Sequence, residues 1–159
     1  MFVTVGAASD AARAAMRRYF AELDARFAGG FDGAAALAEA PSAMDPPRGC
    51  FVLALVDGAT VACGGVQFVD EHTGEIKRMW VDPLARGRGL GRQMLAMLER
   101  VVADSGRRRA ILDTNSVLAE AIAMYGAAGY HPIDRYNDNP YAHHWFEKWL
   151  GDDDETPDR

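Results

Sequence analysis

Residues 75–95, EIKRMWVDPLARGRGLGRQML, decide the fold of this chain. A strand pattern enters a turn rich in glycine and arginine, and an amphipathic helix leaves it with its apolar residues on one face. The glycines at 87, 89 and 91 leave backbone N–H groups uncovered at the start of that helix, where the helix dipole favours an anion. Arginines at 86, 88 and 92 add positive charge. The turn is therefore predicted to hold a diphosphate.

The spacing of the glycines tests the known phosphate-binding patterns. The dinucleotide pattern GxGxxG fails, because Arg92 stands where its third glycine belongs, and the pattern GxxxxGK[ST] does not occur. Glycines in a strand-to-helix turn can also serve steric needs alone. From these residues the ligand is a phosphate compound of open identity, and a nucleotide-binding domain is one alternative.

The composition of the 159 residues is typical of one globular domain in a reducing compartment. Apolar residues make up 49% of the chain and charged residues 25%, and no stretch approaches the roughly 18–20 uncharged residues that cross a bilayer. Residues 1–20 carry charges where a signal peptide has its apolar core. Cys50 and Cys63 lack CxxC spacing, which predicts free thiols and no metal site. We expect a cytoplasmic protein with no membrane partner.

Charge is unevenly spread along the chain. The net charge of −6 argues against nucleic acid as a partner. Residues 77–109 nevertheless hold nine basic and three acidic side chains. This basic middle indicates a small anionic ligand held at one place, although a solvated helix face and a charged turn explain it equally well. Residues 151–159 are mostly charged and have no apolar side chain, so we expect a disordered tail there.

Hydrophobic periodicity predicts an α/β (α+β) domain over residues 1–150. Turn signals such as Asp57-Gly58, between two apolar runs, separate the elements. A single mixed sheet of seven strands, flanked by helices on both faces, is the simplest packing. The predicted strands are 2–5, 50–56, 60–68, 75–81, 110–113, 130–133 and 143–150, and the predicted helices are 8–27, 34–40, 90–105 and 119–128.

Residues 86–91, RGRGLG, resemble the acyl-coenzyme A signature of the GNAT superfamily of acetyltransferases, Q/R-x-x-G-x-G/A. They stand at the family's place, after a strand that ends in Val-Asp-Pro and before a long amphipathic helix. Residues 121–125, AIAMY, followed by Gly129-Tyr130, resemble the family's second motif. The resemblance covers residues 50–150 and is weak before them. It implies a mostly antiparallel sheet of the GNAT acyl-coenzyme A N-acyltransferase fold and an enzyme that uses acetyl-coenzyme A.

The resemblance also implies where coenzyme A lies. The strands at 75–81 and 110–114 would diverge, and coenzyme A would fill the gap like an extra strand, its pantetheine amides paired with the backbone. Asn115, at the end of the fifth strand, could reach the pantetheine or cap the following turn. The implied cofactor-binding residues are Trp80, Val81, Arg86, Gly87, Arg88, Gly89, Leu90, Gly91, Arg92 and Asn115.

Acetyl transfer to an alkyl amine needs a base for the ammonium, a donor for the oxyanion and an acid for the departing thiolate. Tyr125 is the predicted acid, because the second family motif carries a tyrosine there; the alternative is a core tyrosine on an amphipathic helix. Glu75 is the predicted base, since some family members have a glutamate at this place. On an alternating strand, Lys77, Met79 and Val81 share its face, so the alternative is a solvated charge near Lys77. The resemblance implies a backbone N–H near Val81 as the oxyanion donor.

The acceptor site is predicted within residues 134–148, DRYNDNPYAHHWFEK, which are rich in polar and aromatic side chains. Adjacent residues on a strand face opposite ways, so its two neighbouring histidines cannot share a metal ion. The alternative is a turn at 139–140 followed by a strand with one buried aromatic face. The candidates are Asp138 for an ammonium group, Tyr136, Tyr141 or Trp145 for an aromatic wall, and His143 or His144 as an alternative base. Of these, Asp138, Tyr141 and His143 are the predicted substrate-binding residues.

Together these features predict an N-acetyltransferase that moves the acetyl group of acetyl-coenzyme A to a primary amine, by direct attack in a ternary complex. A small free amine is favoured, because nothing beyond the single domain suggests a docking surface for a protein. The alternatives are a non-catalytic acyl-coenzyme A sensor of the same fold and an acetyltransferase of protein or peptide amines. No metal is expected, and a homodimer is left open.

Overall fold

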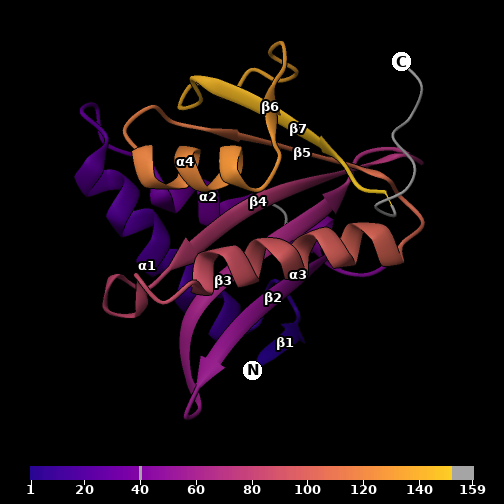
Figure 1. The fold of residues 1–159 in the computed structure, drawn as a ribbon. Coiled ribbons are helices and arrows are strands. Elements are labelled where there is room, and N and C mark those ends of the chain that lie inside the picture. Colours follow the sequence, from indigo (N-terminus) through magenta and orange to yellow (C-terminus); the bar gives the residue numbers. More distant parts are fainter. Residues whose placement is uncertain (40, 152–159) are drawn as a thin grey trace.

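Seven strands form one sheet in the computed structural model, which describes residues 1–39 and 41–151. The strands lie in the order β1-β2-β3-β4-β5-β7-β6, and all neighbours run antiparallel except β4 and β5 (Figure 1). They are β1 (Phe2–Val5), β2 (Gly49–Val56), β3 (Ala59–Phe68), β4 (Thr73–Val81), β5 (Arg109–Thr114), β6 (His131–Pro132) and β7 (His144–Trp149). The predicted mixed, mostly antiparallel sheet is confirmed. Apart from residue 151, the expected disordered tail lies outside the described residues.

The helices in the described part of the chain follow the apolar periodicity of the sequence. They are α1 (Asp10–Arg26), α2 (Gly33–Ala38), α3 (Leu90–Asp104) and α4 (Ala119–Ala127), with short 3-10 helices η1 (Pro41–Met44) and η2 (Pro83–Ala85). α1 begins where the Oγ of Ser9 accepts a hydrogen bond from the N–H of Ala12, which satisfies one free N–H of the first turn. All predicted helices and strands are present, with ends within two residues of the prediction.

Helices cover both faces of the sheet (Figure 1). On one face, Met94, Leu95, Leu98 and Val102 of α3 are buried in a core cluster that also holds Tyr125 of α4. On the other face, a second core cluster contains the buried residues of α1 together with Met44 of η1. Two successive glycines of β3 show the close packing, because a Cβ at Gly64 would collide with Leu98 and one at Gly65 with Met44. The predicted flanking helices are therefore confirmed.

β4 and β5 separate after three residue pairs. Their parallel pairing runs from Thr73–Arg109 to Glu75–Ile111, and the rest of β4 has no partner on that side in the described chain. β5 instead continues along β7 as far as Thr114. A gap therefore opens in the middle of the sheet, as the family resemblance implied (Figure 1).

A β-bulge in β4 changes which side chains face which helices. Cys63 pairs with Trp80 while Gly65 pairs with Lys77, so β4 carries one extra residue, and Arg78 has a left-handed φ of 57°. Ile76, before the bulge, and Val81, after it, both pack in the cluster under α3. Glu75 precedes Ile76 and therefore lies on the opposite face from Val81. The prediction that Glu75 shares a face with Met79 and Val81 is wrong, because simple alternation does not survive the bulge.

Candidate active site

The glycine turn between β4 and α3 leaves a helix N-terminus open to a ligand. Gly87 and Gly89 have left-handed φ angles of 83° and 77°, which glycine adopts without steric cost. Gly89 is the N-cap of α3, and no described side chain caps this end of the helix. A Cβ at either glycine would meet no atom within 4 Å, so the space before the helix is open. The first N–H groups of α3 can therefore donate to an anion.

A cavity of about 390 Å³, here called the cofactor cavity, lies against this turn. Its lining includes eight of the ten predicted cofactor-binding residues: Trp80, Val81, Arg86, Gly87, Gly89, Leu90, Gly91 and Arg92. The other two, Arg88 and Asn115, are not part of this lining. Free N–H groups, arginines and open space together fit the diphosphate of coenzyme A. The individual contacts stay a prediction.

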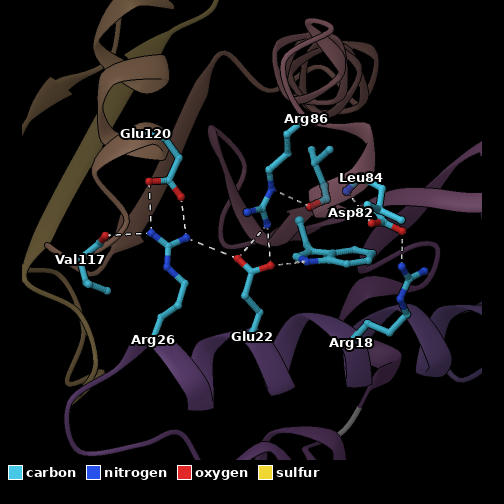
Figure 2. Close-up of polar contacts among 10 residues, drawn as sticks. Arg18, Glu22, Arg26, Asp82, Leu84, Arg86, Val117 and Glu120 are labelled. Atoms are coloured by element: carbon cyan, nitrogen blue, oxygen red, sulfur yellow. Dashed lines mark hydrogen bonds and ion pairs between the residues drawn. The ribbon is translucent and has the colours of Figure 1, made fainter.

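Glu22 of α1 holds the glycine turn (Figure 2). The Nη2 of Arg86 donates to both carboxylate oxygens of Glu22, at 2.6 and 2.7 Å, and the Nε1 of Trp80 donates to one of them at 3.3 Å. The Nε of Arg86 donates to the carbonyl oxygen of Val81 at 3.0 Å. Arg86 is predicted to hold the pyrophosphate, but in the structure its guanidinium is engaged by these groups. It fastens the turn to α1.

A second contact from α1 reaches α4 at the same cavity (Figure 2). The Nη1 of Arg26 donates to Glu120 at 2.5 Å, and its Nη2 donates to the carbonyl oxygen of Val117 at 3.1 Å. The hydrogen bond from Arg26 lowers the pKa of Glu120, so this pair is charged at neutral pH. Glu22 and Glu120 both line the cofactor cavity, and each carboxylate is offset by an arginine.

A larger cavity of about 720 Å³, here called the acceptor cavity, adjoins the first. Its lining comes mainly from α1, α2, β4, β5, α4, the loops that flank the helices, and the loop between β6 and β7. The two cavities share Tyr19, Leu23, Met79, Leu118, Ala121 and Tyr125 in their linings, and so they meet at these side chains. A thioester bound in one cavity and an amine bound in the other would come together there.

Tyr125 lies at this junction. The residue is only 7% exposed, and none of the hydrogen bonds in residues 1–39 and 41–151 involves its hydroxyl. No side-chain nitrogen or oxygen in this part of the chain is both fully buried and unpaired, so the hydroxyl borders the cavity space. Burial, helped by the negative charge of Asp113, raises the pKa of Tyr125. The phenol therefore keeps its proton at neutral pH and can donate it.

Glu75 lines the acceptor cavity from β4. Its Oε2 accepts a hydrogen bond from the Tyr136 hydroxyl at 2.9 Å. Burial raises the pKa of Glu75, while the positive charge of Lys77 and the Tyr136 hydrogen bond act in the opposite direction. A carboxylate with a raised pKa is a better proton acceptor than an exposed one. The geometry favours a base over a solvated surface charge, and the catalytic role stays a prediction.

The predicted acceptor residues are only partly brought together. Tyr141 lines the acceptor cavity, whereas Asp138 and His143 belong to the lining of neither cavity. The Nδ1 of His143 accepts a hydrogen bond from the backbone N–H of Ser116 at 3.1 Å, and the Nε2 of His144 lies 2.9 Å from the Ser116 hydroxyl. Both imidazoles therefore contact the loop between β5 and α4. Their substrate roles remain predictions without support from a cavity.

The sequence reading missed Asp113 of β5. Its carboxylate lines the acceptor cavity and accepts hydrogen bonds from the Nδ2 atoms of Asn137, at 2.6 Å, and Asn139, at 3.3 Å. An acidic residue directly after the apolar stretch Ala110–Leu112 was the available signal, because β5 borders the gap. Tyr19 of α1 also lines both cavities, and it is not among the predicted site residues.

Asn115 joins two loops. Its Nδ2 donates to the carbonyl oxygen of Tyr141 at 2.8 Å, and its Oδ1 accepts from the N–H of Val117 at 2.9 Å. The second bond satisfies a backbone group of the turn before α4. Asn115 does not cap α4 itself, because the N-cap residue is Leu118 and no described side chain caps that helix. Contact between Asn115 and pantetheine stays a prediction.

The two cysteines and the described helices limit other chemistries. Cys50 and Cys63 are unpaired, and burial raises the pKa of Cys63 to about 12, which makes its thiol a poor nucleophile. Within residues 1–39 and 41–151, no three His, Cys, Asp or Glu side chains are grouped to hold a metal ion. The helices of this part are too short or too polar to cross a bilayer.

Known proteins resemble this chain in sequence and in fold. The family model for the Acetyltransferase (GNAT) family matches residues 10–130. An IAA acetyltransferase of Azospirillum brasilense is 36% identical over 93 residues, which are 58% of this chain and 60% of that protein. A GNAT-family acetyltransferase from Staphylococcus aureus superposes with a TM-score of 0.80 at 15% identity, covering 95% and 100% of the two chains. A GNAT-family acetyltransferase from Elizabethkingia anophelis with acetyl-coenzyme A bound has a TM-score of 0.57 at 17% identity, covering 65% and 77%.

The fold and the cofactor cavity fit the class of acyltransferases that use acyl-coenzyme A. The chain belongs to the GNAT family of acetyltransferases, because the family model matches most of its length. The solved structures show a common fold at low sequence identity. This chain covers no more than 60% of the length of the curated relatives that it matches, so their substrates are not carried over to it.

Proposed function

We propose that this protein transfers the acetyl group of acetyl-coenzyme A to the primary amine of a small molecule, by direct attack while both substrates are bound. The observation that carries the proposal is the meeting of the two cavities at Tyr125. One cavity offers the glycine turn and the start of α3 to a diphosphate. The other offers Glu75 and Asp113 to an amine.

The residues of the cofactor cavity fit acetyl-coenzyme A in two ways. The first N–H groups of α3 and the guanidinium of Arg92 suit the diphosphate. Beyond Glu75, the edge of β4 that faces β5 has no strand partner in the described chain, so backbone groups there can pair with the pantetheine amides. The carbonyl oxygen of Val81 already accepts a hydrogen bond from the Nε of Arg86. Bound there, acetyl-coenzyme A supplies an activated thioester.

The proton steps can be assigned to residues at the junction. An alkylammonium has a pKa of about 10, so it must lose one proton before the nitrogen can attack. Glu75 takes this proton, directly or through a water molecule. A carbon–nitrogen bond forms to the acetyl carbon and the carbon–sulfur bond breaks. Tyr125 gives its proton to the departing thiolate and is restored by the second proton from the nitrogen, so the products are an amide and coenzyme A.

Release of coenzyme A thiol tests the proposal. Acetyl-coenzyme A is incubated with the protein and a panel of small primary amines, and product masses are checked for the N-acetylated amine. We expect release that depends on an amine. Calorimetric binding of acetyl-coenzyme A without release for any small amine or peptide would make the chain a sensor. Release with peptides alone would identify an acetyltransferase of protein amines, and stabilisation by ATP or NAD alone would indicate a nucleotide-binding domain.

A cytoplasmic location and a homodimer also remain proposals. The free thiols of Cys50 and Cys63 favour a reducing compartment. Light scattering of the purified protein measures its oligomeric state directly.

A further inference from the structure

Two carboxylates of the acceptor cavity have no counter-ion within the described chain. Glu75 accepts a hydrogen bond from Tyr136, and Asp113 accepts hydrogen bonds from the side-chain amides of Asn137 and Asn139. Neither carboxylate takes part in any ion pair among residues 1–39 and 41–151. Amides and a phenol satisfy hydrogen bonds but leave the negative charges in place. The cavity therefore favours a cationic group.

The basic side chains of the cavity do not cancel this charge. Four acidic side chains and two basic ones line it. The Nη2 of Arg78 donates to Glu39 at 2.9 Å, so these two charges neutralise each other. The positive charge of Lys77 lowers the pKa of Glu75, but burial raises that pKa by more. Asp32 caps α2, with its Oδ1 accepting the N–H of Ala35 at 3.0 Å. Asp32 and Asp113 take part in no ion pair in the described chain, and of these two Asp113 is the one whose charge acts on Glu75 and Tyr125.

Asp113 lies within electrostatic reach of the reaction centre. Burial is the largest cause of the raised pKa values of Tyr19, Glu75, Tyr125 and Tyr136, and the charge of Asp113 raises all four further. Tyr125, which is only 7% exposed, lines the same cavity, and its hydroxyl is unpaired in the described chain. Because this hydroxyl borders open space and has no hydrogen-bond partner in the described chain, a ligand in the cavity can supply one.

An aromatic wall stands in the same cavity. Phe31 and Tyr141 have ring centroids 4.6 Å apart, and Phe27 lies 5.9 Å from Tyr141 and 6.0 Å from Phe31. All three line the acceptor cavity and are only half-buried, so ring surface is left for a ligand. Aromatic side chains bind a further ring by offset or edge-to-face contacts.

We propose, building on the proposed acetyl transfer to an amine, that the acceptor is an arylalkylamine: a primary amine joined by a short alkyl chain to an aromatic ring, without a carboxylate. Asp113 anchors the ammonium beside Glu75. The ring lies on the wall of Phe27, Phe31 and Tyr141. An α-amino acid is a poorer fit, because its carboxylate would enter a cavity that already has an excess of negative charge.

Matched amines test this assignment. The substrates are 2-phenylethylamine, butylamine, which lacks the ring, and phenylalanine, which adds a carboxylate to the same skeleton. We expect kcat/KM to be highest for 2-phenylethylamine, lower by roughly tenfold or more for butylamine, because butylamine offers no ring to the aromatic wall, and lowest for phenylalanine. Equal values for 2-phenylethylamine and butylamine, or a preference for phenylalanine, would overturn the proposal.

Two variants locate the anchor. Asp113→Asn keeps the hydrogen bonds to the neighbouring amides possible and removes the charge, and we expect KM for 2-phenylethylamine to rise roughly tenfold to hundredfold with the affinity for acetyl-coenzyme A unchanged. Asp134→Asn is the control, because Asp134 is an exposed carboxylate that belongs to the lining of neither cavity. It should leave KM within about twofold. Equal effects of the two variants would remove Asp113 from the site.

A third variant locates the wall. Phe31→Leu keeps an apolar side chain, and we expect KM for 2-phenylethylamine to rise by roughly two- to tenfold while that for butylamine stays the same. Equal effects on both amines would remove the wall from substrate recognition. Turnover of aliphatic amines or peptides without turnover of arylalkylamines would refute this assignment and leave acetyl transfer standing. No turnover of any amine would refute both.

Discussion

The cofactor cavity and the acceptor cavity are assembled from the chain in different ways. The largest single part of the cofactor cavity is one continuous stretch, residues 80–92, in which a strand, a glycine turn and a helix N-terminus follow each other. Residues of α1 and α4 complete it. The acceptor cavity collects residues from α1, α2, β4, β5, α4 and the loop before β7. A ligand held by backbone N–H groups needs a local conformation, which glycines reveal in sequence. A ligand held by side chains needs only proximity in the fold, and any segment can supply it.

The largest expected effect lies where the two cavities meet. Tyr125→Phe should lower kcat by roughly 10²–10⁴, the range of a lost general acid. Acetyl-coenzyme A affinity should stay the same, and so should stability, because the hydroxyl makes no hydrogen bond in the described chain. Steady-state kinetics, calorimetry and thermal unfolding check the three quantities. Tyr19→Phe is the matched control, since Tyr19 also borders both cavities; an equal loss of kcat in the two variants would deny Tyr125 a distinct role.

The next effect is confined to the cofactor side. Gly89→Asp places a carboxylate where the diphosphate is expected. Two like charges in direct contact repel each other by roughly several kcal/mol, so the affinity for acetyl-coenzyme A should fall by roughly 100-fold or more. Gly89→Asn is the control, because asparagine has nearly the same shape and tolerates a left-handed φ about as well. The asparagine variant should bind far more tightly than the aspartate variant in calorimetry. Similar affinities would move the anion away from the start of α3.

The cofactor cavity and the acceptor cavity also differ in how much of each the sequence predicts. The elements followed from apolar periodicity, since Leu90, Met94, Leu98 and Val102 recur at helical spacing and Asp57-Gly58 marks a hairpin. The cofactor cavity followed from the glycine turn and the family motif. Both signals are local, and both appear in a single stretch of chain.

The remainder depends on tertiary contacts that leave no local signal. The bulge at Arg78 reverses which residues of β4 face α1, and nothing in the stretch EIKRMWV predicts an extra residue there. Glu22 meets Arg86 across 64 positions, and Asp113 meets Asn137 across 24. Choosing Asp138 for the ammonium relied on closeness in sequence to other polar residues, whereas the cavity is lined by Asp113 from a different strand.

A smaller effect is expected on the acceptor side at Glu75. Because burial raises the pKa of its carboxyl, Glu75 accepts a proton more readily than an exposed glutamate, and Glu75→Gln should lower kcat/KM at neutral pH by roughly tenfold or more. The deficit should shrink as pH approaches the amine pKa of about 10, because more amine then arrives neutral. A pH–rate profile of variant and wild type checks this. Parallel profiles at all pH values would give the proton to a water chain or to His143 or His144.

The raised pKa of Glu75 also predicts how the stability of the protein changes with pH. Its pKa is raised in the folded state, so the folded state favours the protonated form and loses stability as pH rises through that pKa. Glu75→Gln removes this loss, because glutamine stays neutral and can still accept the Tyr136 hydrogen bond. The variant should therefore gain melting temperature relative to wild type at pH 7 and gain less near pH 4. Thermal unfolding of both proteins at both pH values measures this gain. A gain over wild type that is smaller at pH 7 than at pH 4 would contradict the prediction.

The smallest expected effect concerns Glu22, which adds negative charge to the cofactor cavity and also holds the guanidinium of Arg86. Glu22→Gln removes a negative charge from the lining of a cavity proposed for an anion and leaves the guanidinium of Arg86 free to meet that anion. Glutamine can still accept the hydrogen bond from Trp80, so the local packing is kept. Because partly exposed ion pairs contribute only about 0.2–1 kcal/mol, we expect acetyl-coenzyme A affinity to increase by roughly two- to fivefold. The dependence of that affinity on salt should also steepen, since one more cation faces the ligand.

Glu120→Gln is the matched control, because Glu120 lines the same cavity but pairs with Arg26 instead of the glycine turn. It should produce the charge effect alone, a smaller gain. Weaker binding by Glu22→Gln would mean that Glu22 holds Arg86 in its binding position, and the contact drawn in Figure 2 would then belong to the cofactor site rather than compete with it.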